Sequence, residues 1–258
     1  MRKTILSLGL AAAVALGVPA LVAPAAQAAE GVAIPKMSWS FAAPFGTYDR
    51  AALQRGFQVY KEVCAACHSM NLLAYRDLAD LGYNENEIKA IAAQYEVTDG
   101  PNDQGEMFQR PAVPSDRFKA PFPNVQAAKA ANNGAAPPDL SLMAKGRIGG
   151  PDYIHALMIG YENAPAGFEM QPGLSYNKYF PGHQIAMPAP INPDGVTFAD
   201  GTKATVDQQS RDVAHFLMWA AEPKLEQRHR LGVQVVLFLL ILSGLLFVAK
   251  RRIWSDVH

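Results

Sequence analysis

The chain has 258 residues, half of them hydrophobic, and its 23 basic and 23 acidic residues give a formal net charge of zero. A neutral chain has no general positive field, which excludes charge-driven binding of nucleic acid. With two cysteines in all, the chain cannot be a disulfide-rich scaffold either.

The first 28 residues have the pattern of a secretory signal peptide. Arg2 and Lys3 form a charged start, residues 5–22 are an apolar run rich in Ala and Leu, and Ala26-Gln-Ala28 is a small-residue cleavage site. The alternative is an N-terminal membrane anchor, against which the cleavage site argues. We therefore expect export and removal of residues 1–28, which leaves about 230 residues, enough for one domain and a membrane anchor.

A helix is predicted over residues 49–64. Leu53, Phe57, Tyr60 and Cys64 fall at helical spacing and form one apolar stripe. Asp49 is a suitable N-cap, because its carboxylate can accept hydrogen bonds from the first free backbone N–H groups. This helix would deliver the cysteines to their site.

The two cysteines and the residue after them form the motif Cys64-Ala-Ala-Cys67-His68. This spacing is the signature of covalent c-type haem attachment, in which two thiols form thioethers with one haem and the histidine binds the iron. A zinc site would need more ligands, a thioredoxin-type pair would leave His68 unexplained, and a disulfide would close a very small, strained loop. The motif therefore predicts one haem c held by Cys64 and Cys67, with His68 as an axial ligand.

The segment from residue 76 to residue 116 is strongly acidic, with nine acidic and three basic residues and hence a net charge of minus six. It overlaps a second short helix that we predict over residues 71–81, ended by Gly82. An ordinary solvated face explains such a charge, and a docking surface for a basic redox partner is the functional alternative. The sequence leaves both interpretations open.

Proline dominates the middle of the chain, with thirteen of the 19 prolines between Pro111 and Pro193. Such a segment cannot be mainly helix or sheet, and we expect one helical interruption, over residues 152–161. This much coil needs a further source of stability, and a large apolar haem can provide it as a core around which the loops pack. The predicted fold is therefore mainly α with extensive coil: a c-type cytochrome haem domain followed by one C-terminal transmembrane helix.

A late helix is predicted to begin at Thr205, where Thr205-x-x-Gln208 has the form of a capping box. We expect Glu222-Pro223 to end it and expect His215 and Met218 on its surface. Its predicted buried stripe consists of Val213, Phe216, Leu217 and Ala220.

A membrane span is predicted next, because residues 231–249 contain no charged side chain. At ~1.5 Å per residue, nineteen helical residues are about 28 Å long, enough to cross a bilayer. Lys250, Arg251 and Arg252 follow at once and favour the cytoplasmic side, Trp254 is placed at the interface, and His229 lies at the other membrane edge. We thus expect a signal peptide (1–28), a periplasmic haem domain (29–223), an anchor helix (224–250) and a cytoplasmic tail (251–258).

The second axial ligand is harder to identify. A methionine thioether is the expected partner of His68 in an electron carrier, and Met187 lies in a proline-bounded loop, residues 181–190, with no competing secondary structure. Residue chemistry alone favours Met187 but leaves its rivals open. These rivals are Met107, Met143, Met158 and Met170, with His155 and His183 as imidazole alternatives.

The chain resembles the cytochrome c1 family, the haem subunits of cytochrome bc1 complexes, from about residue 53 to residue 254. The motifs that carry the resemblance are Arg55-Gly-Phe-Gln-Val-Tyr-Lys-Glu-Val-Cys64, Asp99-Gly-Pro-Asn102, Gly105-Glu-Met-Phe108, Ala130-Ala-Asn-Asn-Gly134, Pro137-Pro-Asp-Leu-Ser141, Phe180-Pro-Gly182 and Trp219-Ala-Ala-Glu-Pro223. The resemblance implies haem ligation by Cys64, Cys67, His68 and Met187. It also implies that Arg147 lies beside a haem propionate with Tyr153 as its neighbour, which suits a charge-assisted bond to a carboxylate.

The same resemblance implies a function. It predicts an electron-transfer subunit of a respiratory or photosynthetic complex in the bacterial inner membrane, assembled with cytochrome b and a Rieske iron–sulfur protein and passing electrons to a cytochrome c acceptor. Such a subunit is not an enzyme on its own. Two alternatives are a freestanding membrane-anchored cytochrome that donates to an oxidase, and a haem enzyme or gas sensor with an open iron site. Some bacterial members carry a disulfide in the haem domain, which this chain lacks.

Overall fold

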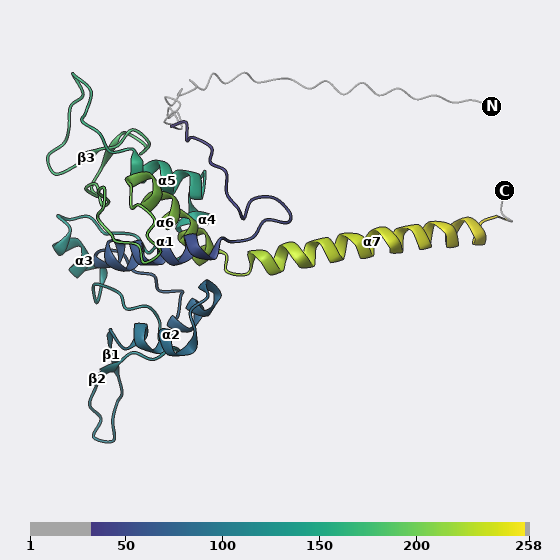
Figure 1. The fold of residues 1–258 in the computed structure, drawn as a ribbon, viewed down its shortest axis with the longest axis horizontal. Coiled ribbons are helices and arrows are strands. Elements are labelled where there is room, and N and C mark those ends of the chain that lie inside the picture. Colours follow the sequence, from purple (N-terminus) through teal and green to yellow (C-terminus); the bar gives the residue numbers. More distant parts are fainter. Residues whose placement is uncertain (1–31, 256–258) are drawn as a thin grey trace, which may run out of the picture. The chain divides into compact units, whose positions relative to one another are not determined.

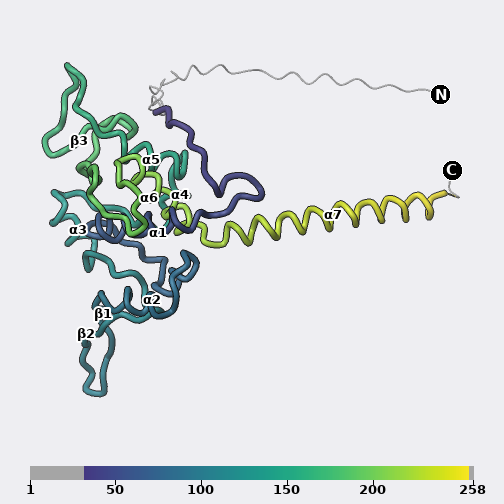
Figure 2. The backbone as a smooth tube through the Cα atoms, viewed as in Figure 1, coloured from purple at the N-terminus to yellow at the C-terminus, as the bar shows by residue number. Residues whose placement is uncertain are grey.

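The computed structural model describes residues 32–255, which are mostly helix and coil with two short antiparallel hairpins (Figures 1 and 2). The elements are α1 (Arg50–Glu62), η1 (Cys64–Ala66), η2 (Tyr75–Leu81), α2 (Glu85–Ala92), β1 (Glu96–Asp99), β2 (Phe108–Pro111), α3 (Val125–Ala131), α4 (Met143–Gly146), α5 (Pro151–Ile159), β3 (Ser175–Tyr176), β4 (Gln184–Ile185), α6 (Val206–Ala221) and α7 (Leu225–Ile253). The predicted mainly-α fold with extensive coil is confirmed, whereas neither hairpin was predicted. The predicted signal peptide, residues 1–28, lies outside the described residues, as do residues 256–258 of the predicted tail.

Helix α1 forms as its sequence predicts. The carboxylate of Asp49 accepts hydrogen bonds from the backbone N–H groups of Ala51 (2.9 Å) and Ala52 (3.3 Å), which satisfies two free donors of the first turn. The stripe of Leu53 and Phe57 is buried. Regular helix ends at Glu62, and the chain tightens into the 3₁₀ turn η1 where the cysteine motif begins.

Helices α1 and α6 pack together with their backbones close to one another. A Cβ atom on Gly56 would lie 2.0 Å from the backbone oxygen of Asp212, so a residue without a side chain is required there. Beside this contact the Arg55 guanidinium bonds both carboxylate oxygens of Asp212, at 2.7 and 3.1 Å, and Asp200 at 2.7 Å. Since Asp212 is buried, its charge needs this partner. The Arg55–Asp212 ion pair therefore fixes the orientation of α1, and with it the position of the cysteine motif that follows this helix.

Helix α6 is the centre of the fold, with α1, α4 and α5 packed against it. Its start is half of the predicted capping box: Thr205 accepts from the Gln208 backbone N–H at 3.1 Å, but the Gln208 side chain turns to Asp212 instead. The prediction that His215 and Met218 are surface residues is wrong, because they are 5% and 9% exposed. Helices α1, α4 and α5 all pack against α6. The single buried stripe predicted from the sequence therefore includes too few of its buried residues.

Aromatic side chains from the segment before α1 cover the face of α6 that was expected to be polar. The rings of Trp39, Phe41 and Tyr48 lie 4.8 to 6.2 Å from the ring of His215. The Nε2 atom of His215 accepts a hydrogen bond from the backbone N–H of Asp49 at 3.2 Å. The N-terminal segment is thereby fixed to both α1 and α6.

Helix α7 is long and apolar enough to cross a membrane, and the rest of the protein does not cover its apolar stretch. This confirms the single C-terminal membrane helix for the described part of the chain. The helix continues through the basic residues to Ile253, beyond residue 250 where the anchor was predicted to end. Its first turn is tied to the domain, since Leu225 is buried and Glu226 accepts from the Tyr48 backbone N–H at 2.8 Å.

The acidic segment is a small folded unit. The predicted helix over residues 71–81 is shorter than expected, beginning only at Tyr75, and Gly82 ends it with a φ of 97°. After α2, strands β1 and β2 form an antiparallel hairpin. Arg110 joins the hairpin to the loop that follows by pairing with Asp99 and, at 2.6 Å, with Asp116.

Candidate functional site

The motif residues lie together in one tight turn after α1. The backbone oxygen of Cys64 accepts hydrogen bonds from the N–H groups of Cys67 (3.1 Å) and His68 (2.9 Å). Both cysteines are free thiols, Cys64 half-buried and Cys67 exposed, so the structure does not support the disulfide alternative. Within residues 32–255 no cluster of three or more His, Cys, Asp or Glu side chains could hold a metal ion.

The imidazole of His68 is fixed by the segment that precedes α4. Its Nδ1 atom lies 2.8 Å from the backbone oxygen of Pro138. Because a carbonyl oxygen can only accept, Nδ1 carries the proton and donates it, which leaves the lone pair of Nε2 free for a metal. Burial lowers the pKa of His68, which favours the neutral, ligand form of the ring.

The carboxylate of Asp139 clamps the two segments together. It accepts hydrogen bonds from the Ser69 hydroxyl (2.8 Å), the Asn71 backbone N–H (2.8 Å) and the Ser141 backbone N–H (2.9 Å). Leu140 adds a backbone bond to the Ser69 oxygen at 2.9 Å. We call residues 138–141, with these contacts to residues 68–71, the Asp139 clamp.

The clamp has an electrostatic consequence. Burial acts to raise the pKa of Asp139, but hydrogen bonds from Ser141, Asn71 and Ser69 outweigh it and hold the pKa below its usual range. The carboxylate is therefore ionised at neutral pH. Sequence reasoning noted Pro137-Pro-Asp-Leu-Ser141 as a shared motif but assigned no role to it; the signal was present, and only the fold shows what the residues contact.

Met187 lies in a second group of residues, in the loop of residues 181–190, which we call the Met187 loop. The prediction that this loop has no secondary structure is wrong, because it contains the two-residue strand β4 just before Met187. The side chain is half-buried, and its backbone oxygen accepts a hydrogen bond from the Tyr161 hydroxyl at 3.1 Å. The buried Asn177 donates to the Leu157 backbone oxygen of α5 at 2.7 Å, and its own N–H donates to the His183 oxygen at 3.0 Å. The Met187 loop is thus tied to the end of α5.

Tyr153 and Arg147 are close to this second group. Tyr153 on α5 is buried, and burial raises its pKa while the charge of Arg147 acts in the opposite direction. Burial and, second, Tyr153 raise the pKa of Tyr161. Arg147 itself is exposed and, within the described residues, makes no ion pair; its guanidinium contacts only the Gly146 backbone oxygen, at 3.3 Å. It is therefore free to bind an acidic group.

The six predicted site residues accordingly fall into two groups. Cys64, Cys67 and His68 share one turn. In the second group the Tyr161 hydroxyl donates to the Met187 backbone oxygen, Tyr153 raises the pKa of Tyr161, and the charge of Arg147 acts on the pKa of Tyr153. No hydrogen bond or ion pair between residues 32 and 255 joins the groups directly. Both rest on α6, the first through α1 and the second through α5.

The two imidazole rivals differ in availability. His155 is buried, and its Nε2 atom lies 2.9 Å from a carboxylate oxygen of Asp207, so that nitrogen already has a partner. His183 stacks on Tyr176 with ring centroids 5.7 Å apart, and its Nδ1 atom is buried without a hydrogen-bond partner. An unpaired buried nitrogen four residues before Met187 fits a site that accommodates a further group.

The methionine rivals are less suited than Met187. Met143 and Met158 pack against the hydrophobic core, where their side chains fill space as apolar groups do. Met107 is 60% exposed in the loop before β2, outside any enclosed site. Met170 is half-buried, like Met187, and stays an alternative on exposure alone.

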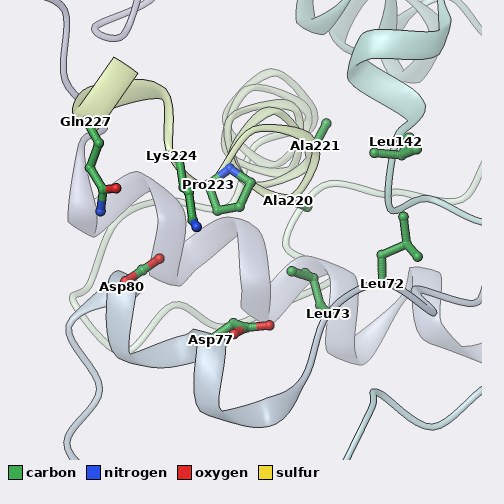
Figure 3. Close-up of a pocket in the computed structure, with 10 residues that line it drawn as sticks. All are labelled: Leu72, Leu73, Asp77, Asp80, Leu142, Ala220, Ala221, Pro223, Lys224 and Gln227. Atoms are coloured by element: carbon green, nitrogen blue, oxygen red, sulfur yellow. The ribbon is translucent and has the colours of Figure 1, made fainter. Parts of the chain in front are cut away.

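A cavity of about 440 Å³ lies elsewhere, at the junction of α6 and α7 (Figure 3). Asp77 and Asp80 from η2 face it from one side and Lys224 from another, with Leu72 and Leu142 at its apolar end. None of the predicted site residues lines this cavity. It was not predicted from the sequence.

The residues present fit a c-type haem. Two free thiols and a histidine with a fixed Nδ1 proton share one turn, and an unpaired nitrogen and an unpaired guanidinium mark the second group. Cys64 and Cys67 would hold the porphyrin edge and His68 one face of the iron.

Comparison with known proteins gives a consistent result. The sequence profile of the Cytochrome C1 family matches residues 39–257. The chain is 50% identical over 246 residues to cytochrome b/c1 of Bradyrhizobium diazoefficiens, covering 87% of this chain and 36% of that longer protein. It is 48% identical over 263 residues to cytochrome c1 of Rhodospirillum rubrum, covering 95% of this chain and 97% of the relative. It is 49% identical to a mitochondrial cytochrome c1 heme protein of Arabidopsis thaliana, covering 91% and 76%.

Proposed function

The chain belongs to the cytochrome c1 family, and from this premise we propose that it is the haem-carrying electron-transfer subunit of a cytochrome bc1 complex. The observation that carries the proposal is the turn from Cys64 to His68, with free thiols and an imidazole held by Pro138. The haem supplies one-electron chemistry when bound. The donor is a Rieske iron–sulfur protein, the acceptor is a cytochrome c, and cytochrome b completes the complex.

In this proposal the chain's residues bind, orient and shield. Cys64 and Cys67 would hold the haem through their sulfur atoms, and His68 would present Nε2 to the metal because Pro138 holds the proton on Nδ1. The Asp139 clamp keeps the ring in that orientation. Met187 would supply a thioether, a soft neutral ligand that favours the reduced metal and so raises the reduction potential.

Arg147 and Tyr153 are proposed to hold a propionate of the same group. The support is that the guanidinium is exposed, unpaired among the described residues and close enough to Tyr153 to influence its pKa. A charge-assisted hydrogen bond from a guanidinium to a carboxylate is stronger than a neutral one. Tyr161 would couple this contact to the Met187 loop.

The proposed topology follows from the signal-like start and the single apolar helix. Residues 1–28 would direct export, residues 29–223 would form the periplasmic haem domain, and α7 would anchor it in the bacterial inner membrane. Residues 251–258 would lie in the cytoplasm, consistent with Lys250, Arg251 and Arg252 at that end.

The chain is proposed to have no catalytic site of its own. Its membership of the cytochrome c1 family favours a complex subunit over a freestanding membrane cytochrome. The half-buried Met187 loop argues against a haem enzyme or gas sensor, because those need an open position on the iron.

Purification from membranes in mild detergent tests the proposal. We expect the chain to co-purify with b-type haems and an iron–sulfur protein, and the complex to reduce cytochrome c from a quinol. A c-type spectrum in a chain that purifies alone from intact membranes would contradict the subunit role and support the freestanding alternative. Absence of covalent haem from the chain would contradict both.

A further inference from the structure

A loop outside the candidate site exposes an aromatic side chain beside α7. Phe45 is 80% exposed, and its neighbours Ala42, Ala43 and Pro44 are exposed as well. No side chain in residues 41–46 is polar or charged. We call residues 42–46 the Phe45 loop. A contiguous exposed apolar segment of this kind marks a contact surface more often than a single exposed residue does.

The exposure of Phe45 is imposed by a closed loop. The backbone bonds Ala42 N–H to Trp39 O, Gly46 N–H to Ala43 O and Thr47 N–H to Ser40 O are each 3.1 Å long. A Cβ atom on Gly46 would lie 2.3 Å from the Ala42 oxygen, so the loop depends on close backbone approach. The aromatic residues on either side of the loop are buried, at positions 41 and 48.

The loop follows the start of α7 toward the membrane span. The Tyr48 N–H donates to Glu226 at 2.8 Å, and the His229 Nδ1 atom donates to the Gly46 oxygen at 3.2 Å. Three residues along a helix amount to ~4.5 Å, so the loop descends α7 in the direction of its C-terminus. Tyr48 thus lies beside Glu226 and Gly46 beside His229. One further step back along the loop places Phe45 near Leu231, the first residue of the uncharged run. Figures 1 and 2 show the segment before α1 reaching the first turns of α7.

The end of α7 that the loop contacts has no interfacial aromatic residue of its own. Trp254 lies near the other end, whereas residues 225–237 include no Trp, Tyr or Phe side chain. Aromatic residues at both interfaces set the depth and tilt of membrane helices. Arg230 is exposed at the same level of α7 and would attract anionic headgroups, whereas Arg228 is already paired with Glu222 at 2.5 Å.

We propose that the Phe45 loop enters the headgroup region of the bilayer and forms a second membrane contact beside α7. Phe45 inserts its ring at the acyl boundary, while the hydrogen bonds at His229 and Glu226 couple the loop to the span. The haem domain is thereby held at two points instead of one, which fixes its rotation about α7. The contact is with lipid, because no side chain of the loop is polar or charged and its hydrogen bonds lead toward the start of the uncharged span.

Spin labelling of the intact protein tests this inference. The full-length chain, in its assembled complex in phosphatidylcholine vesicles, carries a nitroxide at Phe45→Cys. Leu231→Cys serves as the reference for the start of the span, and Thr47→Cys, at the exposed position directly after the loop, serves as the control. The unsubstituted chain sets the background from Cys64 and Cys67. Collision rates of the label with oxygen, which is enriched in lipid, and with a water-soluble nickel chelate are compared.

We expect the label at position 45 to collide more with oxygen than with the nickel chelate, as at position 231, and the label at position 47 to show the reverse. High nickel collision at position 45 would place the loop in water and overturn the proposal. Low collision with both reagents would place it against a protein partner and overturn it equally. These readouts do not depend on electron transfer, so they separate this inference from the proposed function.

Discussion

The two halves of the candidate site are built differently. The turn at Cys64–His68 is held by backbone bonds within the turn and by the Asp139 clamp, whose carboxylate alone accepts three hydrogen bonds. The Met187 loop includes one strand of a hairpin with two residues per strand and is tied to α5 through Tyr161 and Asn177. One half is a local motif with a rigid support, and the other is an irregular loop positioned from a distance.

This difference predicts which half of the site unfolds locally more easily. Local unfolding draws on segments with few buried contacts and little regular structure, and the Met187 loop has positive φ angles at Gly182 (77°) and His183 (59°). The His68 side should therefore keep its ligand under conditions that release the Met187 side. The substitutions of Met187 and Asp139 below each affect one half and should leave the other unchanged.

The largest expected effect is that of Met187→Leu. Leucine has a similar volume but no lone pair, so the iron should lose a soft ligand and the midpoint potential should fall by a sizeable part of the ~0.8 V range that axial ligands span. The Met–Fe(III) charge-transfer band should disappear, and the reduced protein should bind CO. Haem should stay attached through Cys64 and Cys67.

Two further variants make this test specific. Met143→Leu is the matched control, because Met143 packs against the core and should change neither potential nor CO binding. Met187→Lys should restore six ligands but keep the potential low, since an amine stabilises the oxidised metal. A native potential without CO binding in Met187→Leu would move the sixth ligand elsewhere, with Met170 the next residue to test.

The His68 half is tested by Asp139→Ala. Removal of the carboxylate leaves the N–H groups of Asn71 and Ser141 without their acceptor, and hydrogen bonds to a charged group contribute about 1.5–3 kcal/mol each. We expect a loss of about 2–4 kcal/mol in the free energy of unfolding, measured by denaturant titration. Asp139→Asn keeps one amide oxygen and should lose less. Equal and small losses in both variants would show that the clamp does not stabilise the turn.

The two halves of the site also differ in how well the sequence predicts them. The signals for α1, its cap at Asp49 and the cysteine turn are all local, so periodicity and spacing found them. Met187 could be favoured but not separated from its rivals without the family resemblance, because its setting depends on Tyr161 and Asn177, 26 and 10 positions earlier. The role of Asp139 depends on contacts about 70 residues away along the chain, which no local pattern encodes.

The fold shows the same limit. Thr205 and Glu222 correctly bounded α6, whereas His215 was misplaced because the aromatic segment before α1, some 170 positions away, covers the face that the helix alone would leave polar. The two hairpins were missed since their strands are two to four residues long, too short for an alternating pattern to be detected.

A pH titration separates the core from the clamp. Burial lowers the pKa of His215 to about 4, against about 6.5 in an unfolded chain. Protonation therefore favours unfolding: stability is complete above pH 6.5 and falls, by at most about 3 kcal/mol, as the pH drops from 6.5 toward 4. Asp139 contributes in the same sense but in a lower pH window, because its lowered pKa makes its stabilisation present above about pH 4 and lost only below it.

The measurement is the free energy of unfolding at several pH values between 7 and 4. His215→Gln keeps an acceptor for the Asp49 N–H but does not titrate in this range, so its profile should be flatter there. A wild-type profile that matches that of His215→Gln would show that the histidine is not the group responsible.

The smallest expected effect concerns the acidic segment, which belongs to neither half of the site. Glu85 is occupied by Lys89 at 2.7 Å, and Glu87 accepts from the Asn84 N–H at the start of α2, so these acids support local structure. Asp103 and Glu106, in the hairpin loop, are exposed and make no ion pair among the described residues. They are the better test of a docking surface.

Asp103→Asn with Glu106→Gln should slow electron transfer to a basic cytochrome c a few-fold at low salt and flatten its salt dependence, because long-range attraction between exposed charges is what salt screens. Glu169→Gln with Asp194→Asn is the matched control: it removes the same charge from exposed positions elsewhere, and asparagine tolerates the positive φ of 57° at position 194. Both variants should keep the native spectrum and potential, since neither pair contacts the Asp139 clamp or the Met187 loop. If the two pairs change the salt slope equally, net charge alone governs the encounter and the hairpin is an ordinary solvated surface. A slope changed only by the hairpin pair would place the exit of the electron at this segment.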